Sequence, residues 1–402
     1  MSSTRRPDGA RFVGIDLARL LAVVGMMAAH TLGGGEGPPA AVVALIDGPP
    51  STLFAVLGGV SVVLAARARL AAGDRGGAMR SILVRGLVVA VLGFLVIPFA
   101  AAVYIVLVPF GVAIMAASVL VLLPSWLLAV LAAALAAAGG SLVVAAHERL
   151  PLLDGTHTLG TLWSDPLATV ADVALTGVYP ALIWIAYLLI GMLLARGILA
   201  ARAAGRERAA FGGIGGIGAV LTAAALVVSD IGLRRVAAAE FGGSLETARD
   251  VALASGYGVA QGSGLAWQLL AAPHTGTPAD IARTVGIALM VIAGLSLVAS
   301  FLPTRVLQII EPLRAAGAAP LTIYIVHTIL VTLLGALLFE DAPGLARGWG
   351  GWAVQVAIGV GIGALLASSG SRGPFERLVG WFAARAAGPV PARPADGTPA
   401  RP

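Results

Sequence analysis

The feature that most constrains this chain is a succession of long apolar stretches that contain very few charged residues. A helix needs roughly 20 apolar residues to cross the hydrocarbon core of a bilayer, and ten stretches reach or approach that length. They are Gly14–Leu32, Thr52–Leu70, Ser81–Ile97, Val103–Leu123, Ser125–Ala146, Gly177–Arg196, Phe211–Ser229, Ile281–Leu302, Ala316–Phe339 and Trp352–Ser369. The pattern predicts an all-α, polytopic membrane helix bundle with about ten transmembrane helices.

The composition indicates that lipid, and not water, surrounds most of the surface of the folded chain. Of the 402 residues, 58% are hydrophobic and 11% are charged, against about 25% charged in an ordinary soluble domain. The chain has no cysteine, and all 26 basic residues are arginine. The missing cysteine excludes disulfides, thiolate metal sites and a cysteine nucleophile. The missing lysine excludes Schiff-base chemistry and a Walker-type phosphate loop.

Arginines and acidic residues fall on opposite sides of a bundle that crosses the membrane ten times. One side collects Arg5, Arg6, Arg11, Arg67, Arg69, Arg75, Arg80, Arg85, Arg196, Arg202, Arg206, Arg208, Arg305, Arg314, Arg372, Arg377, Arg385, Arg393 and Arg401. The other side collects Glu36, Asp47, Glu148, Asp154, Asp165, Asp230, Glu240, Glu246, Asp250, Glu340 and Asp341. By the positive-inside rule the arginine side is cytoplasmic, which places both termini in the cytoplasm.

The spans divide the chain into five parts. Residues 1–13 form a cytoplasmic N-terminus, and residues 14–229 form the first transmembrane domain. An extracytoplasmic loop covers residues 230–280, and a second transmembrane domain covers residues 281–387. Residues 388–402 are polar and rich in Pro, Ala and Arg, so we expect a disordered cytoplasmic tail.

Ionisable side chains inside membrane segments are costly, so each is a candidate for function. On the first predicted helix, Asp16, Arg19 and His30 lie within about 60° of one another, which makes one polar stripe. Asp16 and Arg19 are three residues apart and can pair, and His30 lies about 16 Å further along the axis. An interfacial ion pair and a histidine at the headgroups would explain the same residues without a function.

The ninth predicted span carries a second polar group. Tyr324 precedes His327 by three residues and Thr328 by four, so the three side chains crowd one side of a helix. His327 falls near the middle of the membrane, where an unpaired imidazole is expensive. It either makes an interhelical hydrogen bond to a carbonyl, or it handles protons or contacts a substrate.

A third group lies at the predicted outer face and consists of His30, Asp47 and His274. A base, a carboxylate that orients it and a second imidazole are sufficient for general acid–base catalysis. Three residues from separate segments have no metal-ligand spacing, so we expect no metal. Close to His274, Thr277 is predicted to cap the helix that Pro278 begins.

Several short motifs, taken together with their order along the chain, indicate a family resemblance. They are Arg11-Phe-Val-Gly-Ile-Asp16-Leu-Ala-Arg19, Gly25-Met-Met-Ala-Ala-His30, Asp47-Gly48, Leu53-Phe-Ala-Val-Leu-Gly-Gly-Val-Ser61, Tyr179-Pro-Ala-Leu-Ile-Trp184-Ile-Ala-Tyr187 and Pro273-His274-Thr-Gly276. Together they resemble bacterial members of the heparan-alpha-glucosaminide N-acetyltransferase family, within the wider group of transmembrane acyltransferases. Two later motifs, Leu321-Thr-Ile-Tyr324-Ile-Val-His327 and Arg372-Gly-Pro-Phe-Glu376, resemble the C-terminal domain of the bacterial YeiB-like proteins, whose function is unknown.

The resemblance implies an enzyme that takes an acyl group from a cytoplasmic acyl-CoA, with acetyl-CoA the expected donor. The acceptor on the far side is often a sugar. In the family, a catalytic histidine lies in the first non-cytoplasmic loop, shortly before the second helix. Here the stretch Leu32–Pro50 contains no histidine; it contains Asp47, and the nearest imidazole is His30.

Under this reading His30 is the general base, oriented by Asp47 or assisted by His274. The remaining polar residues of the helices would serve the donor. Asp16 and Arg19 would line its path, and Tyr324 and His327 would contact it or relay protons.

Three functions remain open at this level. The first is a membrane acyltransferase that modifies an envelope glycan or glycolipid in the bacterial cytoplasmic (inner) membrane. The second is a proton-coupled transporter or exporter, for which Pro98 and Pro109 would interrupt helices as transporters require. The third is a non-catalytic membrane partner whose polar stripes only fix packing. Expected partners are acyl-CoA, the acceptor and the lipid bilayer, with no nucleic acid; a homodimer is left open.

Overall fold

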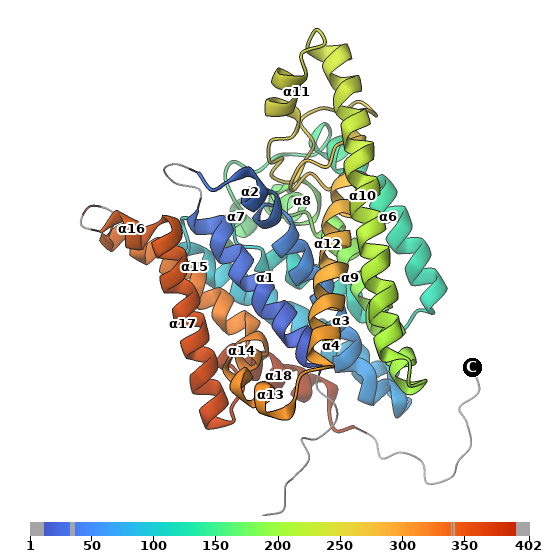
Figure 1. Ribbon diagram of the computed structural model, residues 1–402, viewed down its shortest axis with the longest axis vertical. Coiled ribbons are helices and arrows are strands. Elements are labelled where there is room, and N and C mark those ends of the chain that lie inside the picture. The colour runs from blue at the N-terminus through green and yellow to red at the C-terminus, as the bar shows by residue number, and fades with distance from the viewer. Residues whose placement is uncertain (1–11, 33–36, 339, 341, 391–402) are drawn as a thin grey trace, which may run out of the picture.

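The computed structural model describes residues 12–32, 37–338, 340 and 342–390, and within these ranges every regular element is helical (Figure 1). Nine described stretches are long and apolar enough to cross a membrane: Val13–Thr31, Ala40–Ala71, Arg75–Phe99, Ser125–His147, Ala181–Ala203, Glu207–Glu240, Pro278–Ala299, Pro320–Leu338 and Gly348–Ser369. This confirms the predicted polytopic helical bundle. Most of the predicted cytoplasmic N-terminus and of the predicted disordered tail lies outside the described residues, as do Glu36, Phe339 and Asp341.

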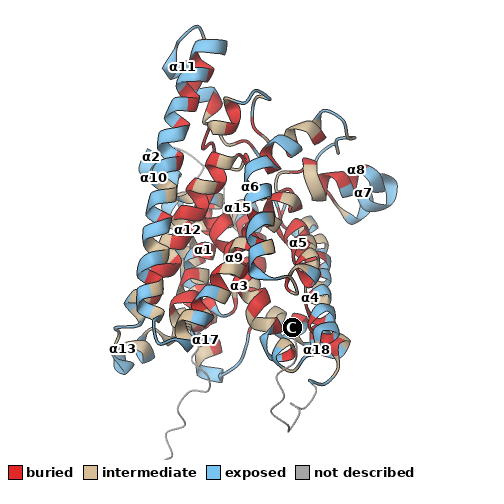
Figure 2. Cartoon of the chain, turned by 90° about the vertical axis from the view of Figure 1, so that its right-hand side faces the viewer, coloured by how far each residue is buried: buried red, intermediate tan, exposed pale blue. Residues whose placement is uncertain are grey.

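Four helices packed on one another form the centre of the bundle. They are α1 (Val13–Thr31), α3 (Pro49–Ala71), α9 (Ala181–Ala203) and α12 (Pro278–Ala299). These helices are largely buried, whereas α10 (Glu207–Glu240) packs on α12 and exposes much of its length (Figure 2). A long apolar helix with an exposed face is stable in lipid, where its backbone groups bond within the helix.

Two glycines let α3 and α9 approach closely. A Cβ atom on Gly59 would lie 2.1 Å from the carbonyl oxygen of Leu188, and one on Gly191 would lie 1.9 Å from that of Val56. Lipid tails give helices no hydrophobic reason to associate, so close backbone packing has to supply the attraction. The glycine content of these helices therefore serves the α3–α9 contact.

The fourth predicted span is shorter than expected. It forms α5 (Leu107–Leu120), whose length of about 21 Å is less than the hydrocarbon thickness. α5 packs against α4 (Arg75–Val96) and α9 and is largely buried by protein. It therefore does not need to reach both faces of the membrane. After it, Pro124 precedes α6 (Ser125–His147).

The ninth predicted span is broken near its start, where α15 (Pro320–Leu338) begins at a proline. The carboxylate of Glu376, on α18 (Pro374–Ala387), accepts hydrogen bonds from the backbone N–H of Leu321 at 2.7 Å and of Thr322 at 3.1 Å. The first N–H groups of a helix have no partner inside the helix. Glu376 supplies that partner and fixes where α15 begins.

α10 continues well past its predicted end. Its 34 residues span about 51 Å, more than a bilayer core requires. The first residues of the predicted loop 230–280 are therefore helical. At this end α10 packs with α11 (Leu245–Ala252) and the 3-10 helix η3 (Trp267–Leu269) around a small apolar core (Figure 1). The indole Nε1 of Trp267 donates to Glu240 at 2.7 Å.

The arginine-rich helix ends gather at one end of the bundle. There Arg314 of α14 (Glu311–Gly317) pairs with Asp16 of α1 at 3.3 Å, and Arg69 donates to the carbonyl oxygen of Ala387 at 3.2 Å. The opposite end carries α2 (Ala40–Ile46), α7 (Leu159–Ser164), α8 (Pro166–Ala171) and α11 (Figure 1). The remaining elements are η1 (Ile97–Phe99), the π-helix η2 (Asp172–Thr176), α13 (Thr304–Ile309), α16 (Pro343–Ala346) and α17 (Gly348–Ser369). The gathering of these arginines at one end agrees with the predicted separation of charge; the ten crossings and the cytoplasmic orientation of the arginine end stay predictions.

Candidate functional site

A cavity of about 390 Å³ lies at the α2 end of the bundle; we call it the outer cavity. Its polar lining residues are His30, Asp47, Ser51, Tyr104, Tyr179, Ser255, Tyr257, His274 and Tyr324. The structure therefore brings together the three residues predicted for acid–base chemistry. His30 comes from α1, Asp47 from the turn before α3, and His274 from the loop before α12.

Asp47 pairs with His274 and not with His30. Its Oδ1 lies 3.1 Å from Nε2 of His274, and the ring of Tyr179 meets the imidazole edge-on at a centroid distance of 5.4 Å. A carboxylate in this position fixes the orientation of an imidazole. The sequence predicts that Asp47 orients His30, whereas in the structure its carboxylate lies against His274.

The backbone of His274 is held in an unusual conformation. Its φ angle is +58°, a region that residues with a side chain rarely adopt. The loop around it fixes that conformation through hydrogen bonds from Gly256 N to the carbonyl oxygen of Pro273 at 2.8 Å and from Gly258 N to that of His274 at 2.7 Å. Strained residues of this kind cluster at ligand and catalytic sites. His274 combines this backbone conformation with a place in the lining of the outer cavity.

His30 belongs to a buried chain of hydrogen bonds. Its Nδ1 lies 2.9 Å from Nε2 of His327, and the two rings are nearly parallel, with an interplanar angle of 2°. Nδ1 of His327 in turn bonds to Oε1 of Gln355 on α17. His327 and Gln355 are each only 1% exposed. We call this chain the relay; it links α17, α15 and α1.

With its oxygen toward His327, the Gln355 amide sets which nitrogens of the relay carry protons. An amide oxygen only accepts, so Nδ1 of His327 is the protonated nitrogen and its Nε2 holds the lone pair. Nδ1 of His30 must then donate to that lone pair. The lone pair of His30 is then on Nε2. No described side chain forms a hydrogen bond with this nitrogen, and the His30 ring lines the outer cavity. An unprotonated imidazole nitrogen is what a general base requires.

Tyr324 lies where the outer cavity reaches into the bundle. Its hydroxyl oxygen accepts a hydrogen bond from the backbone N–H of Val106 at 3.3 Å. The hydroxyl proton therefore remains available as a donor. Tyr324, which is 0% exposed, lines the same cavity as His30.

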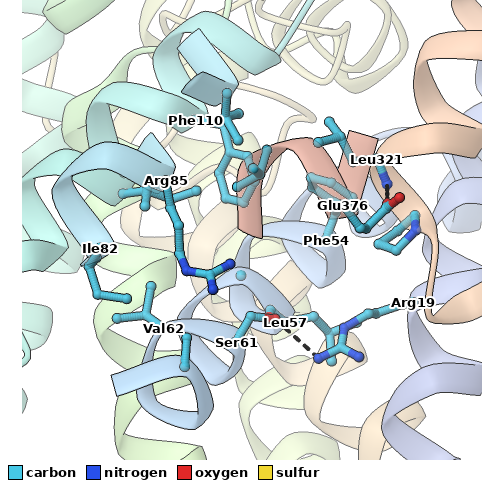
Figure 3. Close-up of a pocket in the computed structure, with 16 residues that line it drawn as sticks. Arg19, Phe54, Leu57, Ser61, Val62, Ile82, Arg85, Phe110, Leu321 and Glu376 are labelled. Carbon is cyan, nitrogen blue, oxygen red and sulfur yellow. Dashed lines mark hydrogen bonds between the residues drawn. The ribbon is translucent and has the colours of Figure 1, made fainter. Parts of the chain in front are cut away.

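A second cavity, of about 170 Å³, lies toward the arginine-rich end; we call it the inner cavity (Figure 3). Its lining is mostly apolar, and its charged members are Arg19, Arg85 and Glu376. Arg19 forms the predicted ion pair with Asp16 at 2.6 Å and also donates to Ser61 at 3.1 Å. The residues predicted to serve the donor are therefore divided, with Tyr324 and His327 on the outer side and Asp16 and Arg19 on the inner side.

Aromatic side chains separate the two cavities. Phe54 lines the inner cavity and Tyr324 the outer one, and their ring centroids are 6.2 Å apart. Phe110 packs on Phe54 at 5.1 Å and on Trp184 at 5.4 Å. A ligand that extends from one cavity to the other would have to pass this aromatic partition.

Sequence reasoning missed several polar residues of these sites. Gln355 and Arg85 are polar residues within predicted spans. Their positions could have marked them as candidate functional residues. The signal for Tyr179 was its place at the start of one motif of the family resemblance. His157 and Asp172 form a further buried pair at 2.7 Å that lines neither cavity. In the described part of the chain, no group of three or more His, Asp or Glu side chains is placed to hold a metal ion.

Residues 11–219 match the family model of the catalytic region of heparan-alpha-glucosaminide N-acetyltransferase. The matched segment contains 209 of the 402 residues (219 − 11 + 1), more than half of the chain. The chain belongs to this family. No curated protein matches it. The family and the nine apolar helices together make it a multi-pass membrane protein of the acetyltransferase type.

In this member of the acetyltransferase family, the matched region supplies only part of the outer cavity. His30 and Asp47 lie within the match, whereas His274 and Tyr324, which also line the cavity, lie beyond it. Residues beyond the match therefore complete the cavity that the family region begins. The similarity of the C-terminal motifs to YeiB-like proteins stays a prediction.

Proposed function

We propose that this protein transfers an acyl group, acetyl in the simplest case, from acyl-CoA at the cytoplasmic face to a sugar or glycolipid in the outer cavity. The proposed location is the bacterial inner membrane, and the acceptor is a component of the cell envelope. One observation carries the proposal: in a chain of this family, the relay leaves the Nε2 lone pair of His30 available to the outer cavity.

The reaction balances with His30 as the base. Its Nε2 takes the proton from the acceptor hydroxyl or amine as the acceptor atom attacks the thioester carbonyl carbon. A bond from carbon to oxygen or nitrogen forms, and the carbon–sulfur bond breaks. The departing thiolate then takes up the proton that His30 received, which returns His30 to its starting state. Base catalysis of this kind contributes about 10²–10⁴-fold to the rate.

The other residues of the outer cavity have separate roles in this proposal. The O–H group of Tyr324 donates to the carbonyl oxygen as it gains negative charge, an interaction that is stronger in the transition state than in the substrate. His274, held by Asp47 at 3.1 Å, hydrogen-bonds the acceptor and orients it toward His30. Both roles need only neutral or singly charged groups that already line the cavity.

The donor would enter through the inner cavity, past Asp16 and Arg19. His30 is 11 residues beyond Arg19 on α1, so the two Cα atoms are about 16 Å apart along the axis. A long, narrow donor arm suits that separation, because its reactive end must pass the partition formed by Phe54 and Tyr324. The protein then moves an acyl group across the membrane without moving the whole donor.

The test is transfer of label from radiolabelled acetyl-CoA to added glycan, or to water, by the purified protein in detergent. We expect His30→Ala to lose at least 100-fold in rate. His147→Ala is the matched control, because His147 bonds to the carbonyl of Val143 in its own helix and lines neither cavity. Proton-dependent flux in proteoliposomes without a donor would replace the proposal by a transporter. No turnover, no flux and altered stability alone would leave a non-catalytic protein.

A further inference from the structure

The charged side chains of the inner cavity are satisfied unequally. Arg19 is neutralised by Asp16, and Glu376 is occupied by the backbone N–H groups at the start of α15. Arg85 points from α4 into the cavity (Figure 3). No described residue accepts a hydrogen bond from its guanidinium or forms an ion pair with it, and its Nε is shielded from solvent without a partner.

The position of Arg85 makes this lack of a partner costly. Its Cα lies ten residues after the start of α4 at Arg75, about 15 Å along the helix. That position lies within Arg75–Phe99, a stretch long and apolar enough to cross a membrane. A charge at this position normally pairs with another group or marks a ligand pathway. The charged group that acts on Arg85 electrostatically is Arg372, which has the same sign.

The rest of the cavity wall selects for an apolar chain. Around the guanidinium the lining includes Leu57, Ile82, Val89 and Ile114 together with two phenylalanines. A small hydrated anion would gain little from such walls, whereas a ligand with an anionic group attached to an extended apolar arm satisfies both the cation and the walls.

We propose that Arg85 is the anion receptor of the inner cavity and binds a phosphate group carried on an extended chain. The guanidinium offers a planar fork of N–H donors that matches two phosphate oxygens. The source of the phosphate is the phosphorylated arm of the donor, and in this form the inference rests on the proposed function. A phospholipid headgroup of the inner leaflet has the same chemistry and is the second source that the experiment separates.

The experiment compares the full-length protein with Arg85→Gln and with Arg75→Gln. Arg75 starts the same helix, carries the same charge and lines neither cavity, so it controls for general electrostatics. The soluble probes are 4′-phosphopantetheine and pantetheine, titrated by calorimetry in detergent. The lipid probes are phosphatidylglycerol and diacylglycerol, whose retention is measured by native mass spectrometry.

The wild type and Arg75→Gln are expected to bind phosphopantetheine more tightly than pantetheine, and Arg85→Gln is expected to lose that preference. A charge-assisted hydrogen bond of about 1.5–3 kcal/mol corresponds to a roughly 10- to 100-fold change in affinity. If only phosphatidylglycerol depends on Arg85, the receptor binds lipid phosphate. If no phosphorylated probe distinguishes Arg85→Gln from the wild type, the inference is wrong.

Stability gives a second measurement that does not depend on turnover. Removing an uncompensated cation from an apolar cavity is stabilising, so Arg85→Met should raise the melting temperature of the ligand-free protein. An arginine with a structural role would give a lower one. The two proposals also fail separately. Phosphate binding through Arg85 without acyl transfer removes the proposed function only. Acyl transfer without any phosphate preference that depends on Arg85 removes the receptor only.

Discussion

Replacing Gln355 by leucine tests the relay at the point furthest from the outer cavity. The substitution keeps an extended side chain of similar volume and removes one acceptor, the amide oxygen that faces Nδ1 of His327. Gln355 lines neither cavity, so a direct effect on donor or acceptor binding is not expected. Any change in rate must pass through His327 to His30.

The size of the effect follows from one hydrogen bond. Without the acceptor, His327 no longer favours the tautomer with the proton on Nδ1, and His30 loses the partner that keeps its own Nε2 unprotonated. A net hydrogen bond of about 1 kcal/mol corresponds to a change of about fivefold. We therefore expect kcat to fall by about fivefold in Gln355→Leu, against about 10²–10⁴-fold in His30→Ala, with KM unchanged.

The assay is single-turnover acyl transfer with two further variants. Gln355→Glu restores an oxygen acceptor and should restore most of the rate. Trp352→Phe is the matched control, because Trp352 also joins α17 to α1, through a bond from its Nε1 to the carbonyl of Val24 at 3.2 Å, but outside the relay. A wild-type rate in Gln355→Leu would refute the reasoning, and so would an equal loss in Trp352→Phe.

Three further predictions concern other parts of the molecule. Tyr324→Phe should lower kcat by about 10²–10³-fold, as removal of an oxyanion donor does; single-turnover rates check this. Gly191→Ala should lower the melting temperature, because its Cβ would lie 1.9 Å from the carbonyl oxygen of Val56 and overpacking costs about 1–3 kcal/mol. The hydrogen bond from the backbone N–H of Gly77 lowers the pKa of Asp74. The stability that the ionised Asp74 carboxylate contributes is therefore complete above the ordinary carboxyl pKa and is lost as pH falls through the lowered pKa of Asp74. Over that pH range the protection of the Gly77 amide against hydrogen exchange should fall, but not in Asp74→Asn.

Features set within one helix could be predicted from the sequence. The pairing of Asp16 with Arg19 follows from the three-residue spacing, and the structure has it at 2.6 Å. The cap before α12 follows from local residue types, and Asp280 N does donate to Thr277 Oγ1 at 3.2 Å. Helix geometry fixes such contacts before any packing occurs.

Contacts between helices could not be predicted in the same way. His30 and His327 are 297 positions apart, and their meeting depends on the rotation and tilt of α1 and α15 in the bundle. The sequence indicated that His327 needs a partner, but not that the partner is an imidazole. Gln355 had a visible signal, a polar side chain in an apolar span, whose meaning appears only once α17 is placed beside α15.

Helix length was the weakest part of the sequence prediction. α5 is too short to cross a bilayer and α10 is too long, yet both have the composition of a span. α5 can be short because it packs between α4 and α9, which bury it. α10 is long because it continues into the small apolar core around Trp267.

In the proposed reaction, an acyl group passes from a donor on the Arg85 side to an acceptor on the His30 side. The most direct test uses sealed proteoliposomes of known orientation, with radiolabelled acetyl-CoA outside and a glycan acceptor trapped inside. Labelled glycan should form only in vesicles whose Arg85 side faces the donor, and His30→Ala should abolish it. Equal labelling in both orientations, or acetyl-CoA entering intact without transfer, would contradict the account.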